Sequence, residues 1–245
     1  MATREEILGK IHKALENGKT NPVLPDPPVV WPVKGLTAEE MIPLFETNLI
    51  AAAGEMVLCR DRADATEKMA DALRKVPVNS GVGGTGRDFE WGIRAGELTE
   101  SLAASVEGIL AGEFASAEKN LKKVLAPSQP ELTSPKTLET LSAGLVPAEF
   151  LLTDTGSAVI RGASAFDRLL CYLAPVCFIA AKKSSLREHL PHAWPEMVAR
   201  LSGDADTAGE FLLMTGPSRT ADIEKILILG VHGPKKVVVF IVENE

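Results

Sequence analysis

The stretch KVVVFIV, residues 236–242, consists almost entirely of β-branched and aromatic apolar residues. Because alternate side chains of a strand point to opposite sides, a strand that is apolar on both faces is typical of the interior of a layered sheet. The stretch VCFIAA at 176–181 has the same character, and EMVLC at 55–59 and FLLMT at 211–215 are shorter examples. These stretches predict a mostly parallel sheet that is covered on both sides.

Segments with helical periodicity lie between these strands, and further apolar runs occur at 122–126, 148–153 and 157–161. We predict helices over residues 37–53, 62–75, 134–143, 164–173, 185–201 (with a break at Pro195) and 221–229. The repeated alternation of strands and helices indicates an α/β fold built in layers.

The N-terminal part of the chain has a different composition. Residues 1–18 predict an amphipathic helix with a narrow apolar stripe, and residues 19–35 predict a proline-rich linker. The α/β domain is predicted over residues 36–245. Because a lone helix of about 14 residues is marginal in water, we expect its stripe to pack either on the chain's own domain or on a partner protein.

The composition bounds the class of protein. The 245 residues are 45% apolar and 24% charged, which is typical of a globular protein with a substantial core. A net charge of −7 and a pI near 5.3 argue against nonspecific binding to nucleic acid or to a membrane surface, because both need a positive field. With no apolar run long enough for a membrane helix and no signal-peptide pattern, we expect a cytoplasmic protein.

The cysteines and histidines do not form the clusters that metal sites need. Cys171 and Cys177 have five residues between them, and Pro191 interrupts the pair His189 and His192. Neither spacing matches a zinc or an iron–sulfur site. We therefore predict neither a metal nor a cofactor.

The glycine-rich stretch GVGGTG, residues 81–86, matches the string G-x-G-x-x-G. A dinucleotide site also needs a strand before this string and a helix after it. The preceding VPVNS is a poor strand and the following RDFEWGI has no helical period, so we interpret the stretch as a glycine loop.

The segment LLMTGPSRTADIEKILILGVHGP, residues 212–234, predicts a strand, a loop and a helix in succession. Thr220 is a good N-cap, and Asp222 and Glu224 would lie in the first helical turn, where acidic residues are favourable. His232 would follow the far end of this helix, about 15 Å away, as a turn residue or a site candidate.

A loop that leads into a helix N-terminus is a ready anion site. Gly216, Ser218, Arg219 and Thr220 are therefore candidates to bind a carboxylate or a phosphate, with the planar fork of Arg219 as the main contact. The alternative is a structural ion pair between Arg219 and Asp222.

The stretch LLTDTGSAVI, residues 151–160, contains the Asp-Thr-Gly motif of aspartic proteases. Pepsin-type proteases need two such loops whose carboxylates share a proton, whereas this chain has one copy in an α/β pattern. We interpret the motif as a tight hairpin between two apolar runs. Asp154 and Thr155 would then line the sheet edge near Arg219, and Arg168 would pair with Asp154 or add positive charge.

The stretches TGPSRTADIEKILILGVHGP, TDTGSAVI and RLLCYLAPVCFIA, together with the N-terminal ILGKIHKAL, resemble the lactate utilisation protein C family, which is built on the LUD domain. The resemblance covers essentially the whole chain and is weakest over residues 77–130. It implies a three-layer α/β fold of the sugar-isomerase and CoA-transferase-like type, related to 5-formyltetrahydrofolate cyclo-ligase. Many members have Glu-Thr-Gly at the hairpin, where this chain has Asp154.

The resemblance also implies a cytoplasmic bacterial protein that acts with two iron–sulfur partner subunits in the oxidation of L-lactate to pyruvate. Since this chain lacks cysteine clusters, we expect a non-redox subunit that binds a small carboxylate or phosphate. The alternatives are a stand-alone enzyme on a phosphorylated or CoA-linked small molecule and a structural scaffold subunit. Neither the motifs nor the resemblance supplies a mechanism, so we predict no catalytic residue.

Overall fold

The computed structural model describes residues 3–17, 31–78, 88–116, 120–125, 138, 140–202, 210–221, 227–229 and 233–244. The chain divides into two compact units, Met1–Pro32 and Val33–Glu245. In the first unit, α1 (Arg4–Asn17) exposes Ile7, Leu8 and Ile11. Most of the predicted linker lies outside the described residues.

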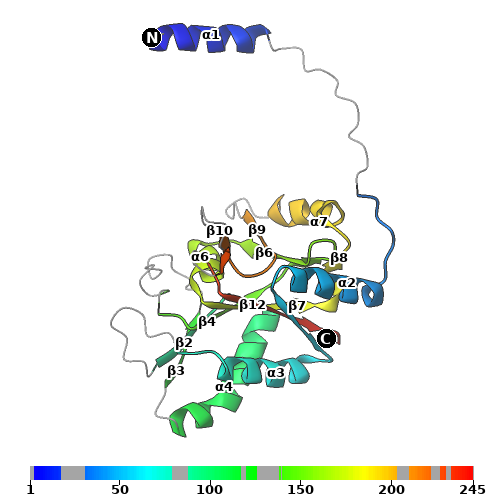
Figure 1. Ribbon diagram of the computed structural model, residues 1–245, viewed down its shortest axis with the longest axis vertical. Helices are drawn as coiled ribbons and strands as arrows, with labels where there is room; N and C mark the ends of the chain where they lie inside the picture. Colours follow the sequence, from blue (N-terminus) through cyan, green and yellow to red (C-terminus); the bar gives the residue numbers. More distant parts are fainter. Residues whose placement is uncertain are drawn as a thin grey trace. The chain divides into compact units, whose positions relative to one another are not determined.

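The second unit is built on a six-stranded sheet in which every described neighbouring pair runs parallel (Figure 1). In spatial order the strands are β1 (Glu55–Cys59), β12 (Lys236–Val242), β7 (Val176–Lys182), β4 (Ala143–Pro147), β2 (Asp88–Ile93) and β3 (Asn120–Leu125). The strands predicted at 55–59, 176–181 and 236–242 are confirmed, and they are neighbours in this sheet.

A second, mixed sheet lies against the first. Its strands, in order, are β8 (Leu186–Arg187), β5 (Phe150–Leu152), β6 (Ser157–Gly162) and β9 (Glu210–Met214). The strands β5 and β6 form the hairpin predicted around the Asp-Thr-Gly motif. The strand predicted at 211–215 is confirmed as β9, but it pairs antiparallel with β6 and does not join the parallel sheet.

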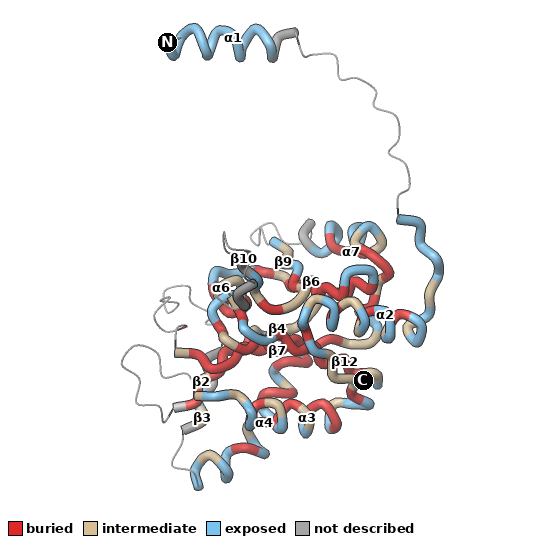
Figure 2. Tube along the Cα trace, viewed as in Figure 1, coloured by how far each residue is buried: buried red, intermediate tan, exposed pale blue. Residues whose placement is uncertain are grey.

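Helices α3 (Arg62–Arg74) and α4 (Glu97–Ser116) cover one face of the main sheet (Figure 1). On β12, Val238, Phe240 and Val242 belong to the core on this face, whereas the alternating Val237, Val239 and Ile241 belong to the core on the other face. The continuous apolar run of β12 is therefore explained by burial on both sides, which Figure 2 shows for the strands of the sheet.

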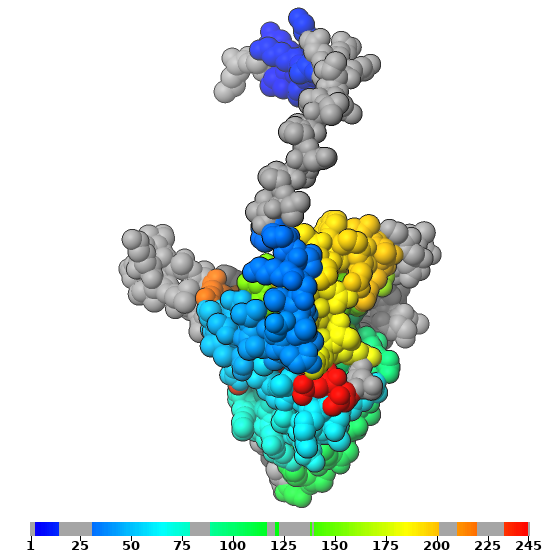
Figure 3. All heavy atoms as spheres, turned by 90° about the vertical axis from the view of Figure 1, so that its right-hand side faces the viewer, coloured from blue at the N-terminus to red at the C-terminus, as the bar shows by residue number. Residues whose placement is uncertain are grey.

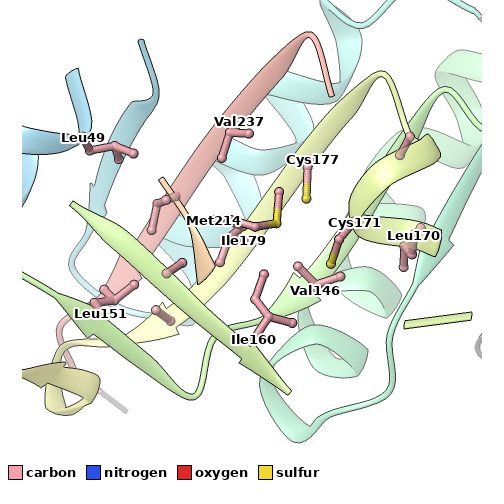
Figure 4. Close-up of a cluster of buried hydrophobic side chains, with 14 of the residues drawn as sticks. Leu49, Val146, Leu151, Ile160, Leu170, Cys171, Cys177, Ile179, Met214 and Val237 are labelled. Carbon is pink, nitrogen blue, oxygen red and sulfur yellow. The ribbon is translucent and has the colours of Figure 1, made fainter. Parts of the chain in front are cut away.

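The core on the other face lies between the two sheets (Figure 4). Val146, Ile179 and Val237 of the main sheet face Leu151 and Ile160 of the second sheet in this cluster. Helices α2 (Ala38–Ala51) and α6 (Ala165–Leu173) complete it.

Helix α7 (Leu190–Ser202) covers the outer face of the second sheet, where Ala193 and Met197 pack with Phe150, Leu152 and Val159. It runs beside α2 on one side of the domain (Figure 3). The helix continues through Pro195, so the predicted break is wrong. The predicted three-layer α/β fold with a mostly parallel sheet is confirmed.

Side-chain caps define where three of the helices begin. Thr37, Asp61 and Ser164 precede α2, α3 and α6, and each accepts a hydrogen bond from the backbone N–H three residues further on. Such caps satisfy N–H groups that have no partner inside the helix.

The helix predicted over 221–229 is wrong. Instead β10 (Arg219–Ala221) pairs antiparallel with β11 (Leu227–Leu229), so that Thr220 lies opposite Ile228. The β-branched and apolar residues of this segment fit a pleated strand, and pairing between strands outweighs the local capping signals. The estimated 15 Å between Arg219 and His232 was based on this helix and does not apply.

Three further outcomes concern the central region. Helix α4 and strand β2 were not predicted. The helix predicted at 134–143 and the glycine loop at 81–86 lie largely or wholly outside the described residues. The element that follows the glycine loop is the strand β2, whereas a dinucleotide site needs a helix there.

Candidate functional site

A cavity of about 520 Å³ lies where β2, β4 and β7 end. Arg94 directly follows β2, Pro147 ends β4 and Lys182 ends β7, and all three line the cavity. Gly96 and Glu97 also line it, so the N-terminus of α4 faces the same space. Ligands of open parallel sheets bind beyond the carboxyl ends of the strands, so this cavity has the position of a ligand site.

Arg94 is held in place on two sides. Its backbone N–H donates to the carbonyl of Leu145 at 2.9 Å. Its guanidinium Nε lies 3.4 Å from a carboxylate oxygen of Asp167, and both side chains are largely buried, at 11% and 7% exposure. Asp167 is itself fixed, because its carboxylate accepts the N–H groups of Ala163 and Ser164 at the start of α6. The guanidinium is therefore oriented before any ligand arrives.

Glu97 and Lys182 form the edge of the cavity next to α4. Lys182 Nζ lies 3.9 Å from Glu97 Oε2, and Arg62 Nη2 donates to Glu97 Oε1 at 2.8 Å. The hydrogen bond from Arg62, together with the charges of Lys182 and Arg62, lowers the pKa of Glu97 below its ordinary value. Glu97 is thus a carboxylate at neutral pH.

The opposite wall is built around the buried ring of Phe150. The guanidinium carbons of Arg187 and Arg200 lie 5.1 and 4.6 Å from the ring centroid, within the range of cation–π contacts. Arg187 donates to both carboxylate oxygens of Glu196 at 2.7 and 2.9 Å, and Arg200 pairs with Glu149. The guanidinium groups of this wall are thus held by carboxylates and by the ring of Phe150.

The charges of the cavity favour an anionic ligand. Four basic side chains line it, against the two acidic side chains Glu97 and Glu149, in a protein whose net charge is −7. The N-terminus of α4 adds a positive potential. Elsewhere in the described part of the chain, no group of three or more His, Cys, Asp or Glu side chains is arranged to hold a metal ion.

The Asp-Thr-Gly hairpin lies against the C-terminal end of α2. Thr155 Oγ1 lies 2.8 Å from Ser157 Oγ, which lies 2.7 Å from Thr215 Oγ1. Gly216 has a φ of +147°, and a Cβ at this position would lie 2.4 Å from the carbonyl oxygen of Ala52. The structure therefore brings the predicted residues Thr155 and Gly216 into one region.

The other predicted residues near this region have mainly backbone contacts. Arg219 Nη2 donates to the carbonyl of Ala51, the last residue of α2, at 3.4 Å. The backbone N–H of Ser218 donates to the carbonyl of Pro234. The backbone N–H of the exposed Asp154 donates to the carbonyl of Glu188. A helix C-terminus carries the negative end of the dipole, so the contact of Arg219 is a capping contact and not the predicted helix N-terminus.

Arg168 lies elsewhere. Its Nε is 3.1 Å from a carboxylate oxygen of Glu210, at the end of the β6–β9 ladder that is remote from the hairpin turn. The proposed pair with Asp154 is therefore not formed. The remaining predicted residues (Asp222, Glu224, His232 and the side chain of Thr220) lie outside the described residues.

The charged residues of the cavity were not predicted from the sequence: Arg94, Glu97, Lys182, Arg187 and Arg200. One signal was present, because Lys182 directly follows the predicted strand 176–181 and so had to lie at a carboxyl end. Arg94 had no such signal, because β2 and α4 were not predicted. Arg187 comes from β8 and Arg200 from α7, so they reach the cavity only through the packing of the second sheet and of α7.

A family model described as the LUD domain matches residues 42–242. The chain is 36% identical over 111 residues to the uncharacterized protein YkgG of Escherichia coli K12, a match that covers 43% of this chain and 46% of that protein. It is 22% identical over 218 residues to lactate utilization protein C of Bacillus subtilis 168, covering 86% of this chain and 82% of that protein. A match to lactate utilization protein C of Bacillus pumilus, at 25% identity, covers 44% and 45%. The E. coli and B. pumilus matches thus span less than half of those relatives.

Among solved structures, the chain is similar to a DUF162 family protein from Deinococcus radiodurans, with a TM-score of 0.52 and 12% identity. The similarity covers 84% of this chain and 99% of that one. At this identity it shows the fold alone. No helix in the described ranges is long and apolar enough to cross a membrane.

Proposed function

The chain belongs to the LUD domain family, and on this premise we propose that it serves the utilisation of L-lactate as a non-redox subunit that binds a small organic anion. The relatives named lactate utilization protein C support the metabolic role. The observation that carries the proposal is the cavity at the carboxyl ends of β2, β4 and β7, in which basic side chains outnumber acidic ones.

The carboxylate of the ligand is proposed to bind at the edge of the cavity next to α4. Arg94 supplies an oriented guanidinium, Lys182 a second cation, and α4 its N-terminus. Charge-assisted hydrogen bonds of this kind are stronger than neutral ones, and the fork of Arg matches a planar carboxylate. The hydroxyl groups of Ser184 and Ser185 line the same cavity and suit a hydroxy or keto group on the ligand.

Iron–sulfur partner proteins are part of the proposal. Oxidation of lactate to pyruvate removes two electrons, and the three cysteines of this chain lack the spacing that holds a cluster. We therefore assign electron transfer to separate proteins and substrate or product binding to this chain. Deletion is expected to abolish growth on L-lactate, and tagged protein is expected to co-purify with iron–sulfur proteins; growth of the deletion strain on L-lactate would contradict this role.

A stand-alone enzyme that acts on a phosphorylated or CoA-linked molecule is the second candidate. The size of the cavity favours it, because about 520 Å³ falls in the range that holds drug-sized ligands, whereas L-lactate is far smaller. Turnover by the isolated chain on a panel of phosphosugars and acyl-CoAs would establish this alternative.

The binding site is tested by calorimetric titration of the full chain with L-lactate and with pyruvate. Arg94→Gln is expected to weaken binding about tenfold or more, because a charge-assisted contact is lost. Arg74→Gln is the matched control, since Arg74 is a partly exposed arginine on α3 that pairs with Glu113 and Asp71 and does not line the cavity. Unchanged affinity in Arg94→Gln would show that the anion binds elsewhere.

The same titration tests the anion site predicted around Arg219. Arg219→Ala removes the guanidinium beside the C-terminal end of α2 without touching the cavity. We expect wild-type affinity for this variant. If Arg219→Ala loses binding and Arg94→Gln keeps it, the ligand binds at the turn of Gly216–Thr220.

A further inference from the structure

Glu97 brings a carboxylate of the protein itself to the cavity. It is the first residue of α4, and its side chain is 74% exposed. One oxygen accepts the hydrogen bond of Arg62, and the other faces the ammonium of Lys182 at 3.9 Å. A carboxylate between two cations beside a helix N-terminus has the surroundings expected for a bound anion.

We infer that Glu97 is a built-in competitor for the anion that this cavity binds. The carboxylate of the ligand replaces Glu97 beside Lys182, and Glu97 moves toward solvent together with Arg62. The inference rests on the proposed function and extends it, because it names the residue that lowers the affinity of the site for its own class of ligand.

The contact that Glu97 loses in this exchange contributes little free energy. The separation of 3.9 Å from Lys182 is too long for a hydrogen bond, and ion pairs between exposed groups contribute little to stability. Arg94 differs, because its partner Asp167 is buried and bound to the start of α6. Ligand binding therefore leaves Arg94 in place and replaces Glu97 as a neighbour of Lys182.

The test compares the affinities of wild type and three variants of the full chain for pyruvate and for L-lactate by calorimetry. Glu97→Gln keeps the size of the side chain and removes its charge, and it is expected to bind about three- to tenfold more tightly. Glu97→Asp keeps the charge but shortens the reach toward Lys182, so a smaller gain is expected. Thermal melts verify that each variant is folded.

Glu100→Gln is the matched control. Glu100 lies in the same first turn of α4 and carries the same charge, but it does not line the cavity. We expect Glu100→Gln to raise the affinity for the anion less than about twofold, because only the long-range repulsion by one negative charge is removed.

The outcomes separate the two proposals. A gain for Glu97→Gln that clearly exceeds the gain for Glu100→Gln supports competition by contact. If both variants bind with equal gains in affinity, or if Glu97→Gln binds with no gain, Glu97 does not compete with the ligand. The proposal of anion binding then still holds. Absence of binding in every variant, including Glu97→Gln, overturns anion binding and the competitor with it.

Discussion

At the scale of single residues, the carboxylate of Glu188 is held by several backbone groups. It is 5% exposed and accepts three backbone N–H groups, from Lys34 and Gly35 at 2.6 Å and from Leu36 at 3.0 Å. Its own carbonyl accepts the N–H of Asp154. Glu188 thus joins the segment that leads into α2 to the Asp-Thr-Gly hairpin.

Glu188→Gln is expected to lower the free energy of unfolding by about 2–3 kcal/mol, because charge-assisted hydrogen bonds are lost and an amide NH₂ is brought against N–H donors. Urea unfolding followed by circular dichroism measures the change. Glu67→Gln, at an exposed position on α3, is the control and is expected to stay close to wild type.

The contribution of Glu188 also depends on pH. Burial acts to raise its pKa, but the N–H donors of residues 34–36 and the nearby His192 hold the pKa below the ordinary value of 4.5. A carboxylate whose folded pKa is depressed stabilises fully above its unfolded pKa and loses this effect as the pH falls through the folded value. The stability difference between wild type and Glu188→Gln is therefore expected to be constant above about pH 5 and to shrink below about pH 4.5. A difference that grows on acidification would contradict this assignment.

The three cysteines are expected to be inert in the native protein. All are buried, and burial raises the pKa of Cys59 to about 11, that of Cys171 to about 12 and that of Cys177 well above its ordinary value. Since the thiolate is the reactive form, a disulfide reagent at pH 8 should release no thiol signal until denaturant is added. Rapid reaction of a native thiol would show that one of them is accessible.

At the scale of elements, the Asp-Thr-Gly hairpin is specified by its glycine. Gly156 has a φ of +66°, and a Cβ there would lie 2.3 Å from the backbone nitrogen of Leu49 in α2. The amide of Asn48 donates to the carbonyl of Thr153 and adds a second contact with the hairpin. The glycine of the motif therefore serves close packing of a turn against a helix.

Gly156→Ala is expected to destabilise the protein by about 2–4 kcal/mol, because the left-handed conformation and the contact with α2 both exclude a side chain. Gly108→Ala is the matched substitution, since Gly108 lies in α4 with nothing within 4 Å of a Cβ. It is expected to stabilise by up to about 1 kcal/mol. Denaturant midpoints of the two variants should move in opposite directions.

At the scale of the whole molecule, the three apolar cores of the described structure lie within residues Val33–Glu245. The helix α1 belongs to the other unit, and its apolar stripe is exposed. Both predicted surfaces for this stripe, the chain's own domain and a partner protein, therefore stay open. Because these cores include no described residue of the first unit, we expect the remainder of the chain to fold by itself.

The fragment 33–245 is expected to unfold cooperatively. Its melting temperature, compared with that of the full chain, also separates the alternatives for α1. A change of at most a few degrees favours a partner protein, and a larger decrease favours packing on the domain. A fragment that does not fold would contradict the division into two units.

The sequence by itself determined the α/β class and the buried strands. The apolar runs of β7 and β12 left no other place for these strands than the interior of a layered sheet, and the Asp-Thr-Gly turn between apolar runs defined a hairpin. Helix α4 escaped prediction because its glycines at 108 and 112 weaken the helical signal, and tertiary packing of Leu102, Val106 and Leu110 overrides it.

Only the tertiary structure decided where the proposed anion site lies. Strand pairing of 219–221 with 227–229 replaced the predicted helix, and with it the helix N-terminus that was to hold the anion. Lys182 is far in sequence from Arg94 and Glu97, and the three meet because parallel strands end at one edge, where α4 also begins. Local patterns determine burial and turns, since these depend on neighbouring residues, whereas a site assembled from several strand ends depends on the order of strands in the sheet.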